Sequence, residues 1–466
     1  MNDQASTLEI LIKNNLKLRL LPPGLFVILK QNLTIQNPKW LENQRLGRWN
    51  GTTPESLKFF EETAAGEIII PRGYARQLIE ICRRHSIPFA LNDQRRSLVP
   101  IDIPFTGKLR EFQEFACSEV MKKDFGTLNA PTGAGKTVMG IFIAAQRKQP
   151  CLILVHTKDL ALQWIERIES FTGIKTEEIG FIGGGEKKIG REFTVGTVQS
   201  VYKCAAEIAP FFGHIIVDEC HRAPSRTFTE AVSAFDSKYM LGLSATLYRR
   251  DRLTKLIYWF IGPCLHQVNK AGLIMRGDIL KADIVIRRTE FKAHFDPVTH
   301  YTKVMTELVS DDERNRLIAA DVAKESSTRE GICIVLSDRK KHCETLCAML
   351  KFGHNIEAVM LTGDMSSAQR KETMDKISSG ESRIIVATGQ LVGEGFDLKE
   401  LSTLFLATPV RFSGRLLQYL GRVLRPAPGK EKARVFDYVD VNVDVLVSGA
   451  MARQRIYSGE QPEDDR

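Results

Sequence analysis

The chain has 466 residues, of which 43% are hydrophobic and 26% are charged, proportions that exclude a disordered or fibrous protein. At roughly 100–200 residues per domain, this length allows two to four domains. Lys and Arg total 65 against 56 Asp and Glu. The net charge of +9 is compatible with a polyanionic partner but does not establish one.

The apolar runs are strand-sized, and a run such as residues 151–155 is far shorter than the 18 or more residues of a spanning helix. The first residues lack the basic and apolar stretches of a secretory signal. Nine scattered cysteines, an odd number, indicate reduced thiols. We therefore expect a cytoplasmic protein with no membrane partner.

Residues 1–105 are predicted to form an N-terminal accessory α+β domain. Segments 24–30 and 67–71 predict strands, and residues 74–85 predict a helix. Aromatic side chains such as Trp40 and Trp49 alternate with basic ones, a composition typical of a nucleic-acid surface because rings stack on bases and cations meet phosphates. The same aromatic residues could instead form the core of a small domain, and the sequence leaves both readings open.

The rest of the chain alternates short apolar strands with helical segments, which is typical of parallel α/β domains. We predict a first lobe at 106–265, a connection at 266–310, a second lobe at 311–450 and a polar tail at 451–466. The first lobe contains strand candidates at 127–130, 151–155, 193–196, 214–217 and 239–243. The second contains candidates at 331–336, 356–361, 383–387, 403–407 and 433–438.

Residues 130–137 (APTGAGKT) lie between a predicted strand and a helical run, the context of a phosphate-binding loop. Glycines let the backbone N–H groups point at a phosphate, and the helix N-terminus adds its positive end. Lys136 is predicted to reach the β- and γ-phosphates of ATP, and the Thr137 hydroxyl to bind Mg²⁺. The backbone of the loop is expected to hold the nucleotide through Pro131, Thr132, Gly133, Ala134 and Gly135.

The apolar strand 214–217 runs directly into Asp218 and Glu219. In parallel sheets, ligand chemistry gathers at the carboxyl ends of the strands. We predict that Asp218 holds Mg²⁺ and that Glu219 orients and deprotonates the attacking water. His221 is expected to be too exposed to serve as a metal ligand. An Asp-Glu pair seen alone would more simply cap a helix.

The ordered set of segments resembles the superfamily 2 helicases and translocases along residues 106–440. The matching segments are 109–113 (LREFQ), 154–164 (LVHTKDLALQW), 194–200 (TVGTVQS), 243–246 (LSAT), 334–339 (IVLSDR), 361–364 (LTGD), 387–397 (ATGQLVGEGFD) and 418–425 (QYLGRVLR). The resemblance implies two tandem RecA-like lobes that use ATP and Mg²⁺.

The resemblance also implies roles for single residues. Arg110 and Gln113 would recognise adenine, and Gly395 and Asp397 would make further contacts with the nucleotide. The nucleic-acid backbone would be contacted by Thr157, Gln199, Thr388 and Gln390. The coupling of the nucleotide to the bound nucleic-acid strand would depend on Ser244, Ala245 and Thr246. Gln418, Arg422 and Arg425 have helical spacing on one face, and the two guanidiniums would neutralise charge on the γ-phosphate. The alternative for these three is a solvated basic stripe.

Residues 218–221 (DECH), 244–251 (SATLYRRD) and 436–440 (FDYVD) are similar to the DNA-directed branch that includes XPB-like repair helicases and UvsW-like recombination helicases. This similarity implies an ATP-dependent motor with 3′-to-5′ tracking on duplex, forked or branched DNA. Binding should be independent of sequence and sensitive to salt. The alternatives are an RNA helicase, a duplex-translocating subunit of a restriction or defence complex, and a non-catalytic scaffold.

Overall fold

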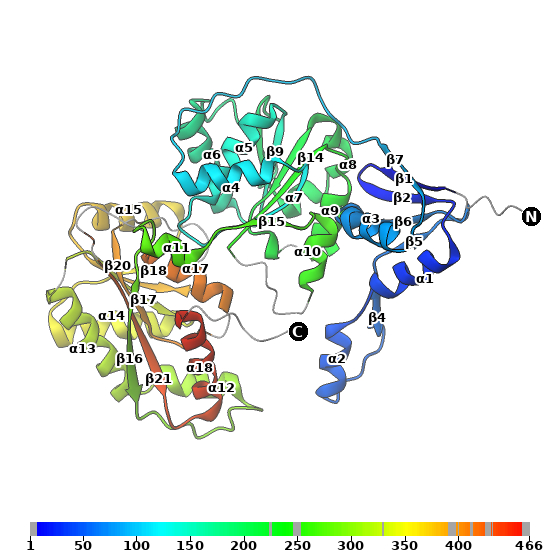
Figure 1. The fold of residues 1–466 in the computed structure, drawn as a ribbon. Coiled ribbons are helices and arrows are strands. Elements are labelled where there is room, and N and C mark those ends of the chain that lie inside the picture. Colours follow the sequence, from blue (N-terminus) through cyan, green and yellow to red (C-terminus); the bar gives the residue numbers. More distant parts are fainter. Residues whose placement is uncertain are drawn as a thin grey trace, which may run out of the picture. The chain divides into compact units, whose positions relative to one another are not determined.

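The computed structural model describes residues 7–222, 226–245, 253–328, 330–389, 398, 400–410, 413–424, 430 and 432–458. It divides into two compact units (Figure 1). One combines Met1–Ala130 with Gly135–Val268, and the other combines Pro131–Ala134 with Asn269–Arg466.

The first unit begins with a small five-stranded sheet in the order β5-β6-β2-β1-β7. Alternating apolar residues of β1 and β2 face a core that helices α1 and α3 also enter. A two-stranded ribbon, β3-β4, and helix α2 complete this part. The elements are β1 (Leu8–Ile12), β2 (Asn15–Arg19), α1 (Pro23–Asn32), β3 (Thr34–Gln36), α2 (Pro38–Arg45), β4 (Ser56–Lys58), β5 (Glu61–Glu62), β6 (Ile68–Pro71), α3 (Ala75–Arg84) and β7 (Phe89–Asp93).

The strand predicted at 24–30 is wrong, because these residues belong to α1. Pro23 occupies the first helical turn, where its fixed φ suits a helix and its missing N–H is not needed. Leu25 and Leu29 are both buried at a spacing of four residues, which is one face of a helix rather than alternate faces of a strand.

The small sheet and the parallel sheet that follows it are joined by buried contacts. Arg72, only 2% exposed, donates to the carbonyl of Ser237 at 2.9 Å, and its guanidinium lies over the ring of Phe125. Trp259 of α10 (Thr254–Phe260) packs into the core of the small sheet. A Cβ at Gly73 would lie 2.2 Å from the carbonyl oxygen of Tyr258, so only glycine allows this approach.

The large sheet of the first unit has eight strands in the order β11-β10-β12-β9-β13-β14-β8-β15. All neighbours are parallel except β10 and β11. The five predicted strands are present, and β10, β11 and β15 are additional. The strands are β8 (Phe125–Asn129), β9 (Cys151–Val155), β10 (Gly180–Gly183), β11 (Glu186–Lys188), β12 (Phe193–Thr197), β13 (His214–Val217), β14 (Tyr239–Ser244) and β15 (Cys264–Gln267). The α-helices before α10 are α4 (Glu111–Met121), α5 (Lys136–Arg147), α6 (Lys158–Thr172), α7 (Val198–Tyr202), α8 (Ala205–Ile208) and α9 (Arg226–Ser233).

The second unit contains a six-stranded parallel sheet in the order β16-β21-β20-β17-β19-β18. The strands are β16 (Ala282–Thr289), β17 (Ile332–Ser337), β18 (Val359–Leu361), β19 (Ile384–Thr388), β20 (Leu401–Leu406) and β21 (Ala433–Asp440). The helices are α11 (Lys270–Met275), α12 (Tyr301–Val309), α13 (Asp312–Thr328), α14 (Lys340–His354), α15 (Ser367–Ser378), α17 (Ser413–Val423) and α18 (Asp444–Ser458). The predicted fold class, two parallel-sheet α/β lobes after a small α+β domain, is confirmed.

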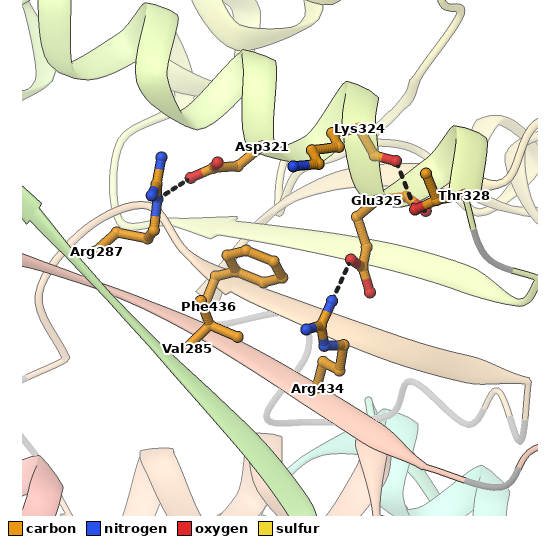
Figure 2. A pocket seen from close by; sticks show the side chains of 8 residues that line it. All are labelled: Val285, Arg287, Asp321, Lys324, Glu325, Thr328, Arg434 and Phe436. Carbon is orange, nitrogen blue, oxygen red and sulfur yellow. Dashed lines mark hydrogen bonds and ion pairs between the residues drawn. The ribbon is translucent and has the colours of Figure 1, made fainter.

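Residues 266–310, expected to be a connection, contain β16, which pairs with β21 over eight residues at the sheet edge. Figure 2 shows how charged pairs tie this edge to α13: Arg287 with Asp321 at 2.8 Å, and Arg434 with Glu325 at 2.7 Å. These pairs surround a hollow of about 610 Å³ above Phe436. Because β16 carries charged residues on its half-exposed face, its sequence lacks the apolar run of the central strands.

A buried histidine in the second unit gives the fold a pH dependence. The His342 ring nitrogens lie 2.9 Å from Ser337 Oγ and 2.8 Å from Asn315 Oδ1. Burial, and secondarily the charge of Arg314, lowers the pKa of His342 to about 3. The unfolded chain binds the proton near pH 6.5 and the folded chain does not, so stability should fall as the pH drops below 6.5.

We expect the wild-type free energy of unfolding to fall by about 1.4 kcal/mol more than that of His342→Gln between pH 7.5 and 5.5. The variant is less stable at both pH values because it lacks the ring, but position 342 no longer titrates. Denaturant unfolding of both proteins at the two pH values measures the difference. Equal pH dependence in the two proteins would contradict this assignment.

Candidate nucleotide-binding site

The strand order of the large sheet brings the predicted site residues of the first unit to one edge. Strands β12, β9, β13, β14 and β8 are successive parallel neighbours, so their carboxyl ends meet at the same edge. Gln199 follows β12, Thr157 follows β9, Asp218 follows β13, Ser244 ends β14 and Lys136 follows β8. The acid pair therefore lies between the nucleic-acid candidates and the phosphate loop.

The phosphate loop has the backbone conformation that its glycines predict. Gly133 and Gly135 have φ values of +89° and +84°, which only glycine adopts without strain. Gly135 immediately precedes α5, so the loop ends at a helix N-terminus suited to an anion. Lys136, 9% exposed, places Nζ 3.4 Å from the Ala130 carbonyl and 3.8 Å from Glu219 Oε1.

Gln113 lies directly against this loop. A Cβ built on Gly135 would be 2.5 Å from Gln113 Nε2, so the glycine makes room for the amide. The Arg110 backbone N–H donates to Gln113 Oε1 at 2.9 Å and fixes the side chain, while Arg110 itself is exposed. The structure therefore brings Gln113 to the nucleotide candidates. The adenine-proximal role that the resemblance implies for Gln113 stays a prediction.

Ser244 connects the start of the loop to the acid pair. Its carbonyl accepts from the Ala130 N–H at 2.9 Å, and its hydroxyl lies 2.9 Å from His221 Nδ1. The same ring nitrogen is 3.2 Å from Glu219 Oε2. The expectation that His221 is exposed is wrong: the side chain is 5% exposed, because the chain turns into a short 3-10 helix that folds the imidazole inward.

The two acids lie in a low-dielectric environment at the end of β13. Asp218 is 8% exposed; its Oδ2 accepts from Trp164 Nε1 at 2.8 Å, and its Oδ1 accepts from the Glu219 N–H at 2.9 Å. Burial, and then the charge of Glu219, raises the pKa of Asp218 to about 6. Glu219 has a φ of +47°, a left-handed conformation that costs roughly 1 kcal/mol and that clusters at functional sites.

The nucleic-acid candidates of the first unit follow neighbouring strands. Thr157 caps α6, and its hydroxyl accepts from the Leu160 N–H at 3.3 Å. Gln199 is exposed in the first turn of α7. Helices α6 and α7 therefore begin after adjacent strands and present polar groups at the same sheet edge.

In the second unit, Thr388 ends β19 and is half-buried. The Tyr419 hydroxyl donates to the Gly389 carbonyl at 2.7 Å and so ties α17 to the end of this strand. Arg422 is half-buried on α17. Outside the described residues lie Thr246, Gln390, Gly395, Asp397 and Arg425, as does the side chain of Gln418.

The sequence did not single out Trp164 or the contact between His221 and Ser244. Trp164 lies 54 residues from Asp218, and its only signal was its place at the end of the segment 154–164. Contacts of this kind depend on sheet order, which no local pattern encodes.

Two family models match the chain. Residues 106–249 match the type III restriction enzyme res subunit, and residues 312–427 match the helicase conserved C-terminal domain. Together they cover the phosphate loop, the acid pair and the segment that contains Arg422, in the order expected of two lobes. The chain belongs to the superfamily 2 helicases.

Curated relatives of this superfamily 2 helicase carry different substrate names. A putative ATP-dependent RNA helicase of Acanthamoeba polyphaga mimivirus is 29% identical over 76% of this chain and 69% of its own length. The DNA 3′-5′ translocase XPB2 of Sulfurisphaera tokodaii is 29% identical over 68% of this chain and 79% of its own. XPB-named helicases of Kineococcus radiotolerans and Mycobacterium tuberculosis also match.

Among solved structures, S. cerevisiae Dbp5 bound to RNA and ADP BeF3 has a TM-score of 0.55 at 15% identity, over 76% of this chain and 89% of its own. T4 UvsW covers 98% of both chains at 20% identity and a TM-score of 0.45. The helicase is thus an ATP-hydrolysing enzyme with the fold of its family. In the described part of the chain, no helix is both long and apolar enough to span a bilayer.

Proposed function

We propose that this helicase couples ATP hydrolysis to unwinding or remodelling of duplex or branched DNA, with 3′-to-5′ tracking. The observation that carries the proposal is the shared sheet edge of the first unit. There Lys136 Nζ lies 3.8 Å from Glu219 Oε1, and Thr157 begins a helix after the adjacent strand. A structural change at the bound nucleotide can therefore be transmitted through a single β-sheet to Thr157, which is proposed to contact the nucleic-acid strand.

The chain's own groups fit a magnesium nucleotide. Carboxylate and hydroxyl oxygens, here from Asp218 and Thr137, are the ligands that Mg²⁺ prefers. The left-handed φ values of Gly133 and Gly135 allow the tight turn of a phosphate-binding loop directly before the N-terminus of α5. When bound, Mg²⁺ neutralises charge on the phosphates. Lys136 holds the β- and γ-phosphates, Gln113 contacts adenine, and Glu219 orients the attacking water and takes its proton.

The second unit is proposed to complete the site. Arg422 and Arg425 would stabilise the charge on the γ-phosphoryl group, with Gln418 beside them and Gly395 and Asp397 contacting the nucleotide. Tyr419 fixes α17 to the end of β19, and this bond would link Arg422 to the strand contact at Thr388. Gln199 and Gln390 would hold the nucleic-acid backbone. Ser244, Ala245 and Thr246 would couple the state of the nucleotide to the grip on the nucleic-acid strand.

DNA is proposed as the substrate because several relatives are named DNA helicases or translocases of 3′-5′ direction. RNA is the second candidate because the mimivirus relative is named an RNA helicase. A duplex-translocating motor is the third, because the first-lobe model is that of a restriction subunit.

ATPase rates with single-stranded DNA, duplex DNA, forked DNA, four-way junctions and RNA distinguish these candidates. We expect the largest stimulation with forked or four-way DNA, weakening steeply with salt. Stimulation by RNA alone would select the RNA helicase. Triplex displacement without fork unwinding would select the duplex translocase.

Residues 1–105 are proposed to add a DNA-contacting surface around α2. Trp49 is 90% exposed, and its ring lies over Gly51, where a Cβ would be only 2.6 Å away. Lys39, Arg45 and Arg48 are exposed in the same segment. The Asn37 side chain donates to the Pro54 carbonyl at 2.8 Å and fastens the segment. A held aromatic ring among cations suits stacking on an unpaired base.

Trp49→Ala is expected to weaken binding of forked DNA about 5- to 100-fold, because stacking contributes about 1–3 kcal/mol per base. Basal ATPase activity without DNA should not change. Phe352→Ala is the matched control, since Phe352 is 84% exposed on α14 of the second unit. Fluorescence anisotropy with forked DNA measures the affinities. Equal affinities for the two variants would leave the surface around α2 without a DNA-binding role.

A further inference from the structure

The side chain of Trp164 donates a hydrogen bond to the carboxylate of Asp218: Nε1 lies 2.8 Å from Oδ2. The indole is 2% exposed. The other carboxylate oxygen, Oδ1, accepts from the Glu219 N–H at 2.9 Å. Because each oxygen has its own donor on a different side, the carboxylate plane of Asp218 is fixed.

The indole ring is itself held by the elements that carry the nucleotide site. A Cβ on Gly140 of α5, the helix that begins with Lys136, would lie 3.1 Å from Trp164 Cη2. The same Cβ would lie 3.1 Å from Leu243 on β14 and 3.8 Å from Ile216 on β13. Gly140 therefore lets the ring pack directly against the phosphate-loop helix and close to β13, which Asp218 follows, and to β14, which ends at Ser244.

The chemistry of the donor favours a metal-binding carboxylate. An indole N–H donates and cannot accept, so it supports an acceptor oxygen and does not compete for a proton. Its hydrogen bond lowers the pKa of Asp218, against the larger effects of burial and of the neighbouring charge on Glu219. Partners that orient a metal ligand in this way commonly change metal affinity or activity by 10- to 100-fold when they are removed.

We propose that Trp164 is a positioning residue that holds Asp218 in the orientation that binds Mg²⁺. The inference rests on the proposed role of Asp218 in the magnesium nucleotide site. Because its side chain is only 2% exposed, Trp164 would act through Asp218 and not through a contact of its own with nucleotide or metal. Its effect should therefore appear in the magnesium-dependent part of nucleotide binding and not in the magnesium-independent part.

The test is Trp164→Phe, which keeps an aromatic ring and removes the N–H. Affinity for a fluorescent ADP is measured with EDTA and across a Mg²⁺ titration. We expect the affinity in EDTA to stay within about 2-fold of wild type, while the half-saturating Mg²⁺ concentration rises about 10-fold or more. A wild-type Mg²⁺ titration in the variant would overturn the proposal.

Trp259→Phe is the matched control, because Trp259 is 3% exposed in the same unit and packs against Phe59 and Tyr74. It should leave the Mg²⁺ titration unchanged. A similar rise in both variants would mean a general loss of packing and would overturn the specific role. If wild type shows no Mg²⁺-dependent nucleotide binding, the proposed nucleotide site fails before Trp164 is tested.

A second measurement does not require Trp164→Phe to fold. The wild-type chain is labelled with 5-fluorotryptophan, and its four indole signals are assigned by Trp40→Phe, Trp49→Phe and Trp259→Phe, which leaves the Trp164 signal by exclusion. Adding Mg²⁺ to the ADP-bound protein should shift the fluorine resonance of Trp164. An unchanged Trp164 resonance, in protein shown to bind Mg²⁺ and ADP, would overturn the proposal.

Discussion

Glu219→Gln is expected to reduce ATP turnover about 10²- to 10⁴-fold while ATP and DNA binding persist. Gln has nearly the same shape as Glu but cannot take a proton from the attacking water. Residue 219 has a left-handed backbone conformation, with a φ of +47°, and Gln places a side chain of the same length on it. The loss should therefore reflect the missing base and not a collapsed site.

Steady-state ATP hydrolysis and equilibrium binding of a fluorescent ATP analogue, measured on the same preparations, separate the two effects. Glu207→Gln is the control, since Glu207 lies on the surface and pairs with Lys187. Turnover of Glu219→Gln within about threefold of wild type would remove Glu219 from the catalytic role.

Lys136→Ala is expected to weaken nucleotide binding itself, by about 10- to 100-fold, because a hydrogen bond to a charged group contributes roughly 1.5–3 kcal/mol. Nζ lies between the start of the loop and Glu219, at 3.4 Å from the Ala130 carbonyl and 3.8 Å from the carboxylate. A buried cation in this position has a phosphate as its natural partner.

Titration calorimetry with ATP measures the affinity directly. Lys122→Ala provides the comparison, because Lys122 is exposed at the end of α4 and pairs with Glu119. ATP affinity of Lys136→Ala equal to that of wild type would contradict the phosphate-loop assignment.

The sequence predicted those parts of the site that local pattern encodes. A strand of buried residues followed at once by Asp218, and a glycine-rich turn followed by Lys136, are signals carried within ten residues each. The central strands were predicted because both of their faces are covered, which requires continuous apolar runs.

The missed parts depend on packing between distant segments. Arg287 of β16 pairs with Asp321 of α13 across the hollow in Figure 2, and such charged residues make the sequence of this strand resemble a connection. Segment 24–30 is apolar without a clear period, and the buried face shared by Leu25 and Leu29 makes it a helix. His221 turns inward because Ser244, 23 residues later, offers its hydroxyl.

We propose that one ATP is held by Lys136 and the acid pair, and that Arg422 and Arg425 contact its γ-phosphate. The structure of the protein bound to forked DNA, ADP and beryllium fluoride, an analogue of the γ-phosphate, measures this directly. Both guanidiniums are expected within hydrogen-bond distance of the fluoride atoms, with Lys136 Nζ on the opposite side. Arginines directed away from a nucleotide that Lys136 binds would contradict the account.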